Sequence, residues 1–428
     1  MRSGCGRRAF FRASTMVAGA CWTSRAESAE ARDPQGADVP PSIRALTPML
    51  GGIVPISDEE RRSRIERART LMADHRIDAI YLESGTSLFY YTGVRWSGGE
   101  RMFAAVLPAR GEIGWVCPKF EEGRARELIR FGTDVRTWEE DEDPGRTVAQ
   151  ILKDRGIATG RIGIEERVRF FLFDMIRRAA PALEYVSADP VTAGCRVIKS
   201  PAEIALMQRA NDITVAAYKA VIPTLREGTT KQQFMAHAAA AHKALGVEGG
   251  IDVEFGELTA SPHGSTRPRT LRAGDVVLMD GDCSVEGYQS DISRTIVFGK
   301  PTQRQKDMWD LEKRAQAAAF AAAGPGVPCE QVDAAARKVI TDAGFGPGYR
   351  VPGLPNRTGH GIGLDGHEWT YLVRGNKTPM AAGMCFTNEP MIVLPGEFGV
   401  RLEDDMYITP SGARFFSQPS PSIDQPFA

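Results

Sequence analysis

The sequence predicts an α+β protein built from two domains. In residues 194–419, two helices followed by strands occur twice, which indicates a pseudo-symmetric body with antiparallel sheets inside and helices outside. In residues 52–193, short strands and helices alternate, as in an α/β domain. The chain has 428 residues, enough for two or three domains of ordinary size, and its 42% hydrophobic and 25% charged residues suit a soluble globular protein.

Composition also narrows the choice of partners. The formal net charge is −1, so the chain lacks the basic footprint of a nucleic-acid-binding protein. We expect neither nucleic acid nor a membrane as a partner. The seven cysteines lack CxxC or zinc-ribbon spacing. Those beyond the first 31 residues are predicted to be buried free thiols.

Residues 1–31 have the features of an export signal. Residues 1–26 contain no acid, and Arg7-Arg8 precedes a mildly apolar run of ten residues from Ala13 to Trp22. That run is too short to cross a bilayer, which takes about 20 residues. Ala29-Glu30-Ala31 offers a cleavage site. The segment resembles a twin-arginine signal, which implies a periplasmic protein. A mitochondrial transit peptide or a wrongly extended start, which would leave a cytoplasmic protein, are the alternatives.

Residues 32–51 are rich in Pro and Gly and are predicted to be a linker. In the domain at 52–193, a capping box at Ser57–Glu60 starts a helix. Periodicity and turn residues predict strands at 79–82 and 161–165, a hairpin of 102–107 with 112–116, and helices at 122–130 and 170–180. No motif in this domain indicates a catalytic or binding site.

In the domain at 194–419, Ser200 caps a long helix, with Pro201 at its first position and Glu203 closing a capping box. A second helix, 231–245, carries two histidines five residues apart. They lie about 140° apart around the helix and cannot share one metal ion. The other predicted elements are strands at 253–258, 276–280, 288–298, 384–387, 391–394 and 401–408, helices at 302–323 and 329–343, and a tail at 420–428.

Five positions in this domain carry metal-ligating side chains within distinctive motifs. They are Asp280 and Asp291 in DGDCSVEGYQSD, His360 in TGHGIGLDGHE, Glu389 in TNEP and Glu403 in VRLED. Four carboxylates that meet at one site repel one another unless cations are present. Two divalent ions would balance the four negative charges, with a neutral histidine as the fifth ligand. Mixed oxygen and nitrogen ligands suit manganese, zinc, cobalt or iron rather than a thiolate site.

This ordered set resembles that of the pita-bread metallopeptidases, the group of the Xaa-Pro dipeptidases (prolidases) and aminopeptidase P. The match covers residues 194–412, about half of the chain. The amino-terminal domain resembles that of creatinase and the prolidases. The resemblance implies a pita-bread fold and a dinuclear centre, with manganese as the first expectation and zinc, cobalt or iron as alternatives. In dinuclear hydrolases the ions lie ~3.5–4 Å apart and share a water whose pKa falls toward ~7.

The resemblance also implies a role for each ligand. Asp280 would chelate one ion, while Asp291 and Glu403 would bridge both. His360 and Glu389 would bind the second ion. Glu389 is in addition the expected general base for the shared water, which attacks the substrate as metal-bound hydroxide.

Three further residues match positions that act on substrate in this group. His263, in SPHG, is expected to meet the substrate's carbonyl region or its carboxylate. His367 is expected to stabilise the tetrahedral intermediate, and Arg401 to orient a substrate or a ligand. For each residue the alternative is a structural role, either as a hydrogen-bonded histidine or in a surface salt bridge.

The chain departs from the group's pattern at three places, of which Asp282 bears on the type of reaction and the other two bear on substrate specificity. Asp282 stands on the same strand face as Asp280, where a small residue is usual. It is interpreted as a solvated turn residue first, and otherwise as an acid behind the ligands or an extra metal contact. A related lyase that acts on dimethylsulfoniopropionate also has a D-x-D pair here. Trp369-Thr370 replaces the usual x-Pro, and Met391 replaces the Gly after NEP.

The sequence therefore predicts a dinuclear metal-dependent hydrolase, an Xaa-Pro dipeptidase or aminopeptidase, that cleaves Xaa-Pro bonds in dipeptides or short peptides and acts as a homodimer. One alternative is a metal-dependent lyase of the dimethylsulfoniopropionate type, or another non-peptidase, since a fold does not fix function. A second is a binding protein that has kept the fold. A metal-free enzyme like creatinase is disfavoured, because creatinases lack the ligand set that is intact here.

Overall fold

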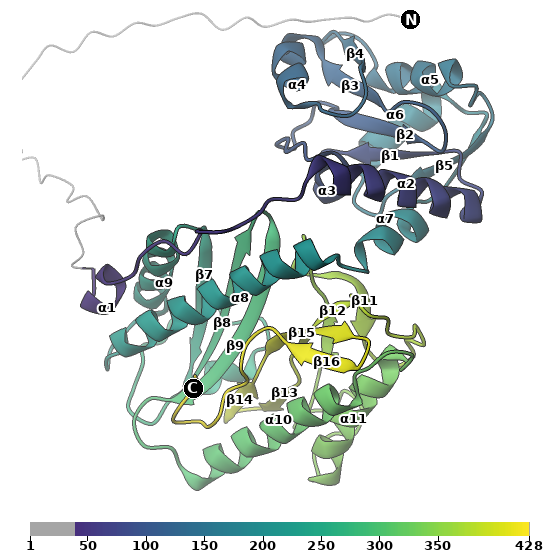
Figure 1. Cartoon of the computed structure of the whole chain (residues 1–428). Helices are drawn as coiled ribbons and strands as arrows, with labels where there is room; N and C mark the ends of the chain where they lie inside the picture. The colour runs from purple at the N-terminus through teal and green to yellow at the C-terminus, as the bar shows by residue number, and fades with distance from the viewer. Residues whose placement is uncertain (1–38, 428) are drawn as a thin grey trace, which may run out of the picture. The chain divides into compact units, whose positions relative to one another are not determined.

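The structure, a computed structural model, describes residues 39–427 (Figure 1). The expected signal segment at 1–31 lies outside the described residues, as does the first part of the expected linker. Residues from Pro40 onward belong to one compact unit. Within the described part, no helix is long and apolar enough to cross a membrane.

The described end of the expected linker contains a short helix, α1 (Pro41–Arg44). Its Ile43 is buried in the same apolar cluster as residues of the larger domain. The hydroxyl of Ser42 donates a hydrogen bond to the carbonyl of Ala220. Burial of one apolar side chain thus fixes this end of the segment, which the Pro- and Gly-rich composition did not indicate.

The amino-terminal domain is a six-stranded mixed sheet in the order β4-β3-β2-β1-β5-β6. Its central strand β1 runs antiparallel to β2 and parallel to β5. The elements are α2 (Asp58–His75), β1 (Ala79–Glu83), α3 (Thr86–Thr92), β2 (Ala104–Pro108), β3 (Gly114–Pro118), α4 (Glu122–Leu128), β4 (Asp134–Trp138), α5 (Pro144–Asp154), β5 (Gly160–Ile164), α6 (Phe170–Ala179), β6 (Leu183–Ser187) and α7 (Asp189–Arg196).

Helices cover both faces of this sheet. Alternate residues of a strand point to opposite faces. Ile80 and Leu82 accordingly share an apolar cluster with α2 and α7. Ala79 and Tyr81 share another with α5 and α6. The domain is the predicted α/β domain.

The first half of the larger domain consists of α8 (Pro201–Val221) and α9 (Lys231–Leu245) beside the antiparallel sheet β7-β8-β9 (Figure 1). Capping boxes start both helices. The strands are β7 (Gly249–Phe255), β8 (Val276–Val285) and β9 (Tyr288–Val297).

Two strand predictions in this half are wrong in extent. Strand β7 begins at Gly249 and ends at Phe255, where a 3-10 helix follows, rather than spanning 253–258. Strand β8 continues to Val285 instead of ending at residue 280. A tight turn joins it to β9, with φ of 52° at Glu286 and 91° at Gly287. Positive φ at both central residues suits a two-residue hairpin, so both strands can extend to the turn.

The second half repeats the plan with α10 (Gln303–Ala322), α11 (Cys329–Asp342) and a five-stranded sheet in the order β11-β10-β12-β15-β16. The strands of this sheet are β10 (Gly359–Gly361), β11 (Glu368–Leu372), β12 (Cys385–Asn388), β15 (Asp404–Thr409) and β16 (Gly412–Phe415). A separate hairpin pairs β13 (Met391–Leu394) with β14 (Phe398–Arg401). Two helix pairs with inner sheets confirm the predicted α+β fold.

The single strand expected at 401–408 is divided. Strand β14 ends at Arg401 and β15 begins at Asp404, so Leu402 and Glu403 lie between them. The backbone N–H of Glu403 donates to the carbonyl of Ser293 in the first half. This bond across the halves replaces pairing within the sheet and directs the glutamate toward β9.

A buried joint between β9 and the β14–β15 segment connects the two halves. Arg294 of β9 is fully buried, and its guanidinium lies 2.7 Å from the carboxylate of Asp404. The same guanidinium donates to the carbonyl of Glu403. The hydroxyl of Thr295 accepts from the backbone N–H of Arg401 and donates to its carbonyl. The joint sets the relative positions of the motifs in the two halves.

Candidate active site

The two aspartates of the first half lie on one face of the β8–β9 hairpin. In its register Asp280 stands opposite Ser293, and Asp282 stands opposite Asp291. Because both strands alternate with a period of two, all four side chains point to the same side of the sheet. That side faces the β14–β15 segment of the other half.

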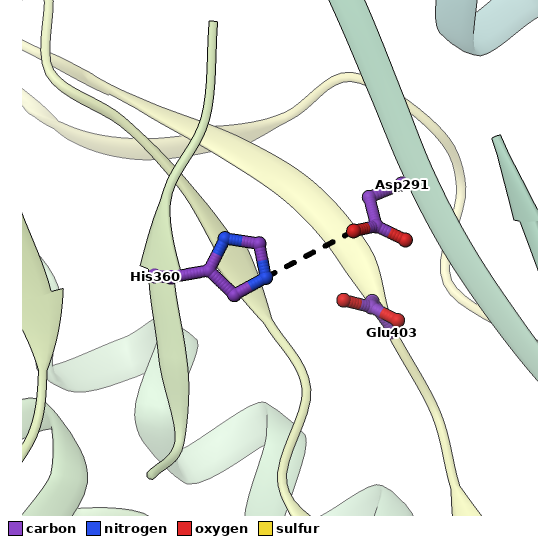
Figure 2. A group of neighbouring side chains, drawn as sticks. All are labelled: Asp291, His360 and Glu403. Atoms are coloured by element: carbon purple, nitrogen blue, oxygen red, sulfur yellow. Dashed lines mark ion pairs between the residues drawn. The ribbon is translucent and has the colours of Figure 1, made fainter. Parts of the chain in front are cut away.

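Three ligand candidates from the two halves meet directly (Figure 2). Asp291, His360 and Glu403 each offer one ligand atom, and these atoms lie within 4.8 Å of one another. The Nε2 atom of His360 is 3.9 Å from Oδ2 of Asp291 and 3.2 Å from Oε1 of Glu389. Figure 2 shows the imidazole turned toward the two bridging candidates. A fourth ligand candidate, Glu389, thus lies against the same imidazole nitrogen.

The fifth candidate, Asp280, joins the group through Ser293. The hydroxyl of Ser293 lies 2.8 Å from Oδ1 of Asp280 and 2.6 Å from Oε2 of Glu403. A hydroxyl has one proton and satisfies one of the two carboxylates at a time. The buried guanidinium of Arg401 forms an ion pair with Asp280, and its Nε donates to Ser293. The structure therefore brings all five predicted ligands together, with Arg401 beside them.

The four carboxylates of this cluster outnumber the cationic groups beside them, so their negative charges repel one another. Burial raises the pKa of Asp291 well above its usual range, and the neighbouring Glu403 and Asp280 raise it further. Burial and the carboxylates of Glu389 and Asp280 raise the pKa of Glu403. For Glu389, burial is outweighed by the hydrogen bond and the charge of His360, which lower its pKa. Cations at this place would stabilise the ionised carboxylates. The oxygen and nitrogen donor set therefore fits divalent metal ions such as manganese, zinc, cobalt or iron.

His367 lies against His360 and is not part of the group formed by Asp291, His360 and Glu403. Its ring stacks on that of His360, with centroids 3.7 Å apart and planes 19° apart. A guanidinium nitrogen of Arg357 lies 2.8 Å from its Nδ1. Because an arginine can only donate, Nδ1 accepts and the ring proton resides on Nε2. Desolvation and the nearby His360 and Arg357 lower the pKa of His367 to about 4. It is a neutral donor at pH 7.

His263 borders a different pocket from His367. It is exposed and shares a pocket of about 200 Å³ with Asp280 and Arg401. The guanidinium of Arg401 also donates to the carbonyl of Pro262, next to His263 in the chain. All the predicted site residues thus border one region, in which His263 and His367 line two different pockets.

The interpretation of Asp282 as a turn residue is wrong. It lies within β8, opposite Asp291, and is exposed on the ligand-bearing face. Partial burial and the neighbouring Asp280 raise the pKa of its carboxyl group. The extended β8 is the reason, since the hairpin turns only after Val285.

Two groups of residues near the site were missed from the sequence. Ser293 follows Asp291 by two positions, and the period of the strand could have indicated it. The second group surrounds Glu368, which is buried between Lys199, at 3.0 Å, and Arg196. Despite its burial, these two cations lower the pKa of Glu368 to about 2. Lys199 and Arg196 are far from Glu368 in the chain, so no local motif identifies them. His237 and His242 bond within their own half and take no part.

The fold and the site together define a two-domain metallopeptidase with a pita-bread catalytic domain. Residues 205–410 match the family model described as metallopeptidase family M24, and residues 64–198 match the creatinase/prolidase N-terminal domain. The chain belongs to metallopeptidase family M24.

Named relatives agree with this assignment along most of their length. An Xaa-Pro dipeptidase of Lactobacillus delbrueckii subsp. lactis is 28% identical, over 84% of this chain and 98% of its own. The crystal structure of dipeptidase PepE from Mycobacterium ulcerans is similar with a TM-score of 0.79 and 33% identity, covering 85% of this chain and 97% of that chain. A prolidase from Thermococcus sibiricus is similar with a TM-score of 0.77 and 29% identity, covering 84% and 97%.

Proposed function

We propose that this protein is a dinuclear metal-dependent Xaa-Pro peptidase that hydrolyses the bond before proline in dipeptides or short peptides. The observation that carries the proposal is the convergence of four carboxylates and His360 beside a neutral histidine that can donate a hydrogen bond. The names of the Lactobacillus and Thermococcus relatives support the choice of substrate.

Five side chains would hold the two ions, with manganese as the first choice. They are Asp280, Asp291, His360, Glu389 and Glu403. When bound, divalent ions of such a pair polarise the scissile carbonyl and lower the pKa of a coordinated water toward ~7. Because the pKa values of Asp291 and Glu403 are raised without cations, metal binding should release protons from the site.

Side chains of the protein carry out proton transfer, stabilisation of the intermediate and substrate binding. Glu389, with its lowered pKa, is ionised at neutral pH and accepts the proton of the attacking water. It then returns that proton to the nitrogen of the departing proline. His367 donates from Nε2 to the oxygen that becomes negative in the tetrahedral intermediate. Arg401 orients the ligand Asp280 through their ion pair, and the exposed His263 in the neighbouring pocket contacts the carboxyl-terminal part of the substrate.

A lyase acting on dimethylsulfoniopropionate is the second candidate, and Asp282 favours it. This acid lies on the ligand-bearing face opposite Asp291, so the D-x-D pair, which resembles that of the lyase, lies next to the metal-ligand candidates. A lyase would cleave a carbon–sulfur bond by removing a proton, and its substrate has no peptide bond.

One substrate panel distinguishes the two candidates. Purified protein loaded in turn with manganese, zinc, cobalt or iron is given Xaa-Pro dipeptides, longer Xaa-Pro peptides and dimethylsulfoniopropionate. The proposal predicts release of free proline, or of a peptide that begins with proline. Release of dimethyl sulfide with intact peptides would replace it by the lyase. The protein's mass in solution tests the proposed homodimer, which should be about twice the chain's 46.6 kDa.

A further inference from the structure

A second pocket lies on the His367 side of the ligand cluster. It is a cavity of about 210 Å³, equal to roughly seven water molecules at ~30 Å³ each. His367 and Trp369 form its wall next to the cluster. Because the ring of His367 stacks on His360, the cavity begins one ring away from a metal ligand. It has room for one long side chain.

The position of this cavity assigns it to one part of a substrate. His263 lines another pocket, which shares no residue with this cavity. If His263 holds the proline end, as proposed above, the residue before the proline is left to the cavity beside His367. The cavity is then the place where the side chain of that residue lies.

The cavity wall carries more negative than positive charge. Six acids line it against two arginines: Glu83, Glu165, Glu166, Asp189, Asp365 and Glu368, with Arg167 and Arg196. The two arginines pair with Asp365 and Glu368. Arg169 pairs with Glu83 and Lys199 pairs with Glu368, although neither cation lines the cavity. Among the described residues, no ion pair involves the remaining three acids, Glu165, Glu166 and Asp189.

Of these three acids, Glu165 is the one whose ionised form is most destabilised by burial. Only 9% of it is exposed. Burial raises the pKa of its carboxyl group to about 7, even with a hydrogen bond from Ser87 and with Arg196 nearby. A buried carboxylate without a cationic partner is costly to ionise. A cation entering the cavity would offset that cost.

Trp369 adds an aromatic surface to this acidic wall. Its side chain is 42% exposed, although it is large and apolar. The indole N–H donates to the carboxylate of Glu166 at 3.1 Å, and the ring lies 5.0 Å from that of Tyr371. A tryptophan face attracts ammonium and guanidinium groups. Acid and aromatic surface together are the features that recognise a positively charged side chain.

We infer that this cavity is a specificity subsite for the side chain of lysine or arginine in the residue before the proline. The inference rests on the proposed function and adds to it a preferred substrate class, basic-residue–Pro peptides. Glu165 and Glu166 supply the negative charge, and Trp369 supplies the aromatic face.

The test compares kcat/KM of the metal-loaded protein on Arg-Pro and Lys-Pro with that on Met-Pro, a neutral substrate of similar length. The subsite predicts a preference of about tenfold for the basic dipeptides, the size of one charged hydrogen bond. Glu165→Gln and, separately, Trp369→Leu should each reduce the ratio several-fold. Glu184→Gln, which changes an exposed acid on β6, should leave it unchanged. Because Glu165 is buried, the exposed Glu166→Gln serves as a second charge variant if the first fails to fold.

A calorimetric titration of the metal-free protein with Arg-Pro and Met-Pro gives a readout independent of turnover. Tighter binding of Arg-Pro, weakened in Trp369→Leu, supports the subsite. Equal use of all three dipeptides by the wild type, or a preference that survives both charge variants and Trp369→Leu, would overturn the subsite and leave the Xaa-Pro activity standing. Failure to cleave any Xaa-Pro peptide would instead remove the proposed function, and the substrate assignment with it.

Discussion

Replacing His367 by alanine removes the proposed donor to the tetrahedral intermediate while leaving the ligand atoms in place. The ring touches His360 by stacking only, and its one hydrogen-bonded nitrogen faces Arg357. None of the five ligand candidates loses a hydrogen bond in His367→Ala. The variant should therefore bind metal as the wild type does.

The expected loss appears in turnover. Removal of one donor to a developing oxyanion lowers kcat by roughly 10²–10³, equivalent to about 2.7–4 kcal/mol. A donor that acts only in the transition state lowers kcat and kcat/KM equally, with little change in KM. Steady-state kinetics on one Xaa-Pro dipeptide, with metal content measured on the same sample, gives both quantities.

Two variants serve as references for this measurement. His237→Ala removes a helix histidine that bonds to Thr224 and should retain wild-type kinetics. Arg357→Met leaves the imidazole but removes the group that fixes its tautomer, so it should cost less than His367→Ala. Loss of metal in His367→Ala would make this histidine a ligand and refute the reasoning. If His367→Ala kept the wild-type kcat, the histidine would have a structural role only.

The remaining predictions concern the metal centre, the joint between the halves, acid stability and export. Asp291→Ala should lose both ions and activity, and elemental analysis that finds two ions per chain would contradict its bridging role. Arg294→Met leaves a buried aspartate without its cation and should lower the free energy of unfolding in urea by roughly 3–5 kcal/mol; Lys338→Met, in an exposed pair, should cost under about 1 kcal/mol. Glu368 has its pKa lowered from 4.5 to about 2, so its stabilising effect is complete above pH 4.5 and is lost as pH falls through 2. The stability advantage of the wild type over Glu368→Gln should shrink across that window, and an advantage independent of pH would contradict the assignment. Lysine at both positions of Arg7-Arg8 should hold the precursor in the cytoplasm, and unchanged periplasmic mature protein would exclude the twin-arginine route.

The ligand candidates could be named from the sequence because their ordered motifs resemble those of the pita-bread metallopeptidases. The structure brings the same side chains together. Helices were also predictable, since the capping box at Ser200 marks where the long helix α8 begins. The five cysteines among the described residues are free and buried, as their spacing suggested.

Other features depend on contacts between distant segments, which leave no periodic signal. The division of the expected strand at 401–408 follows from the bond between the Glu403 backbone and Ser293. Strand β10 is three residues long in a glycine-rich stretch and shows no alternation. The burial of Glu368 requires Arg196, which comes from the end of the other domain. Substrate specificity could not be predicted from the sequence for the same reason, since residues of both domains line the cavity beside Trp369.

The proposed activity needs two metal ions and acts on the bond before proline. Metal-free protein titrated with manganese, with bound metal per chain and proline release from an Xaa-Pro dipeptide followed together, measures this directly. A dinuclear centre predicts no proline release without metal and a rise in activity that saturates at two ions per chain. Full activity in metal-free protein, or two bound ions without proline release, would contradict it.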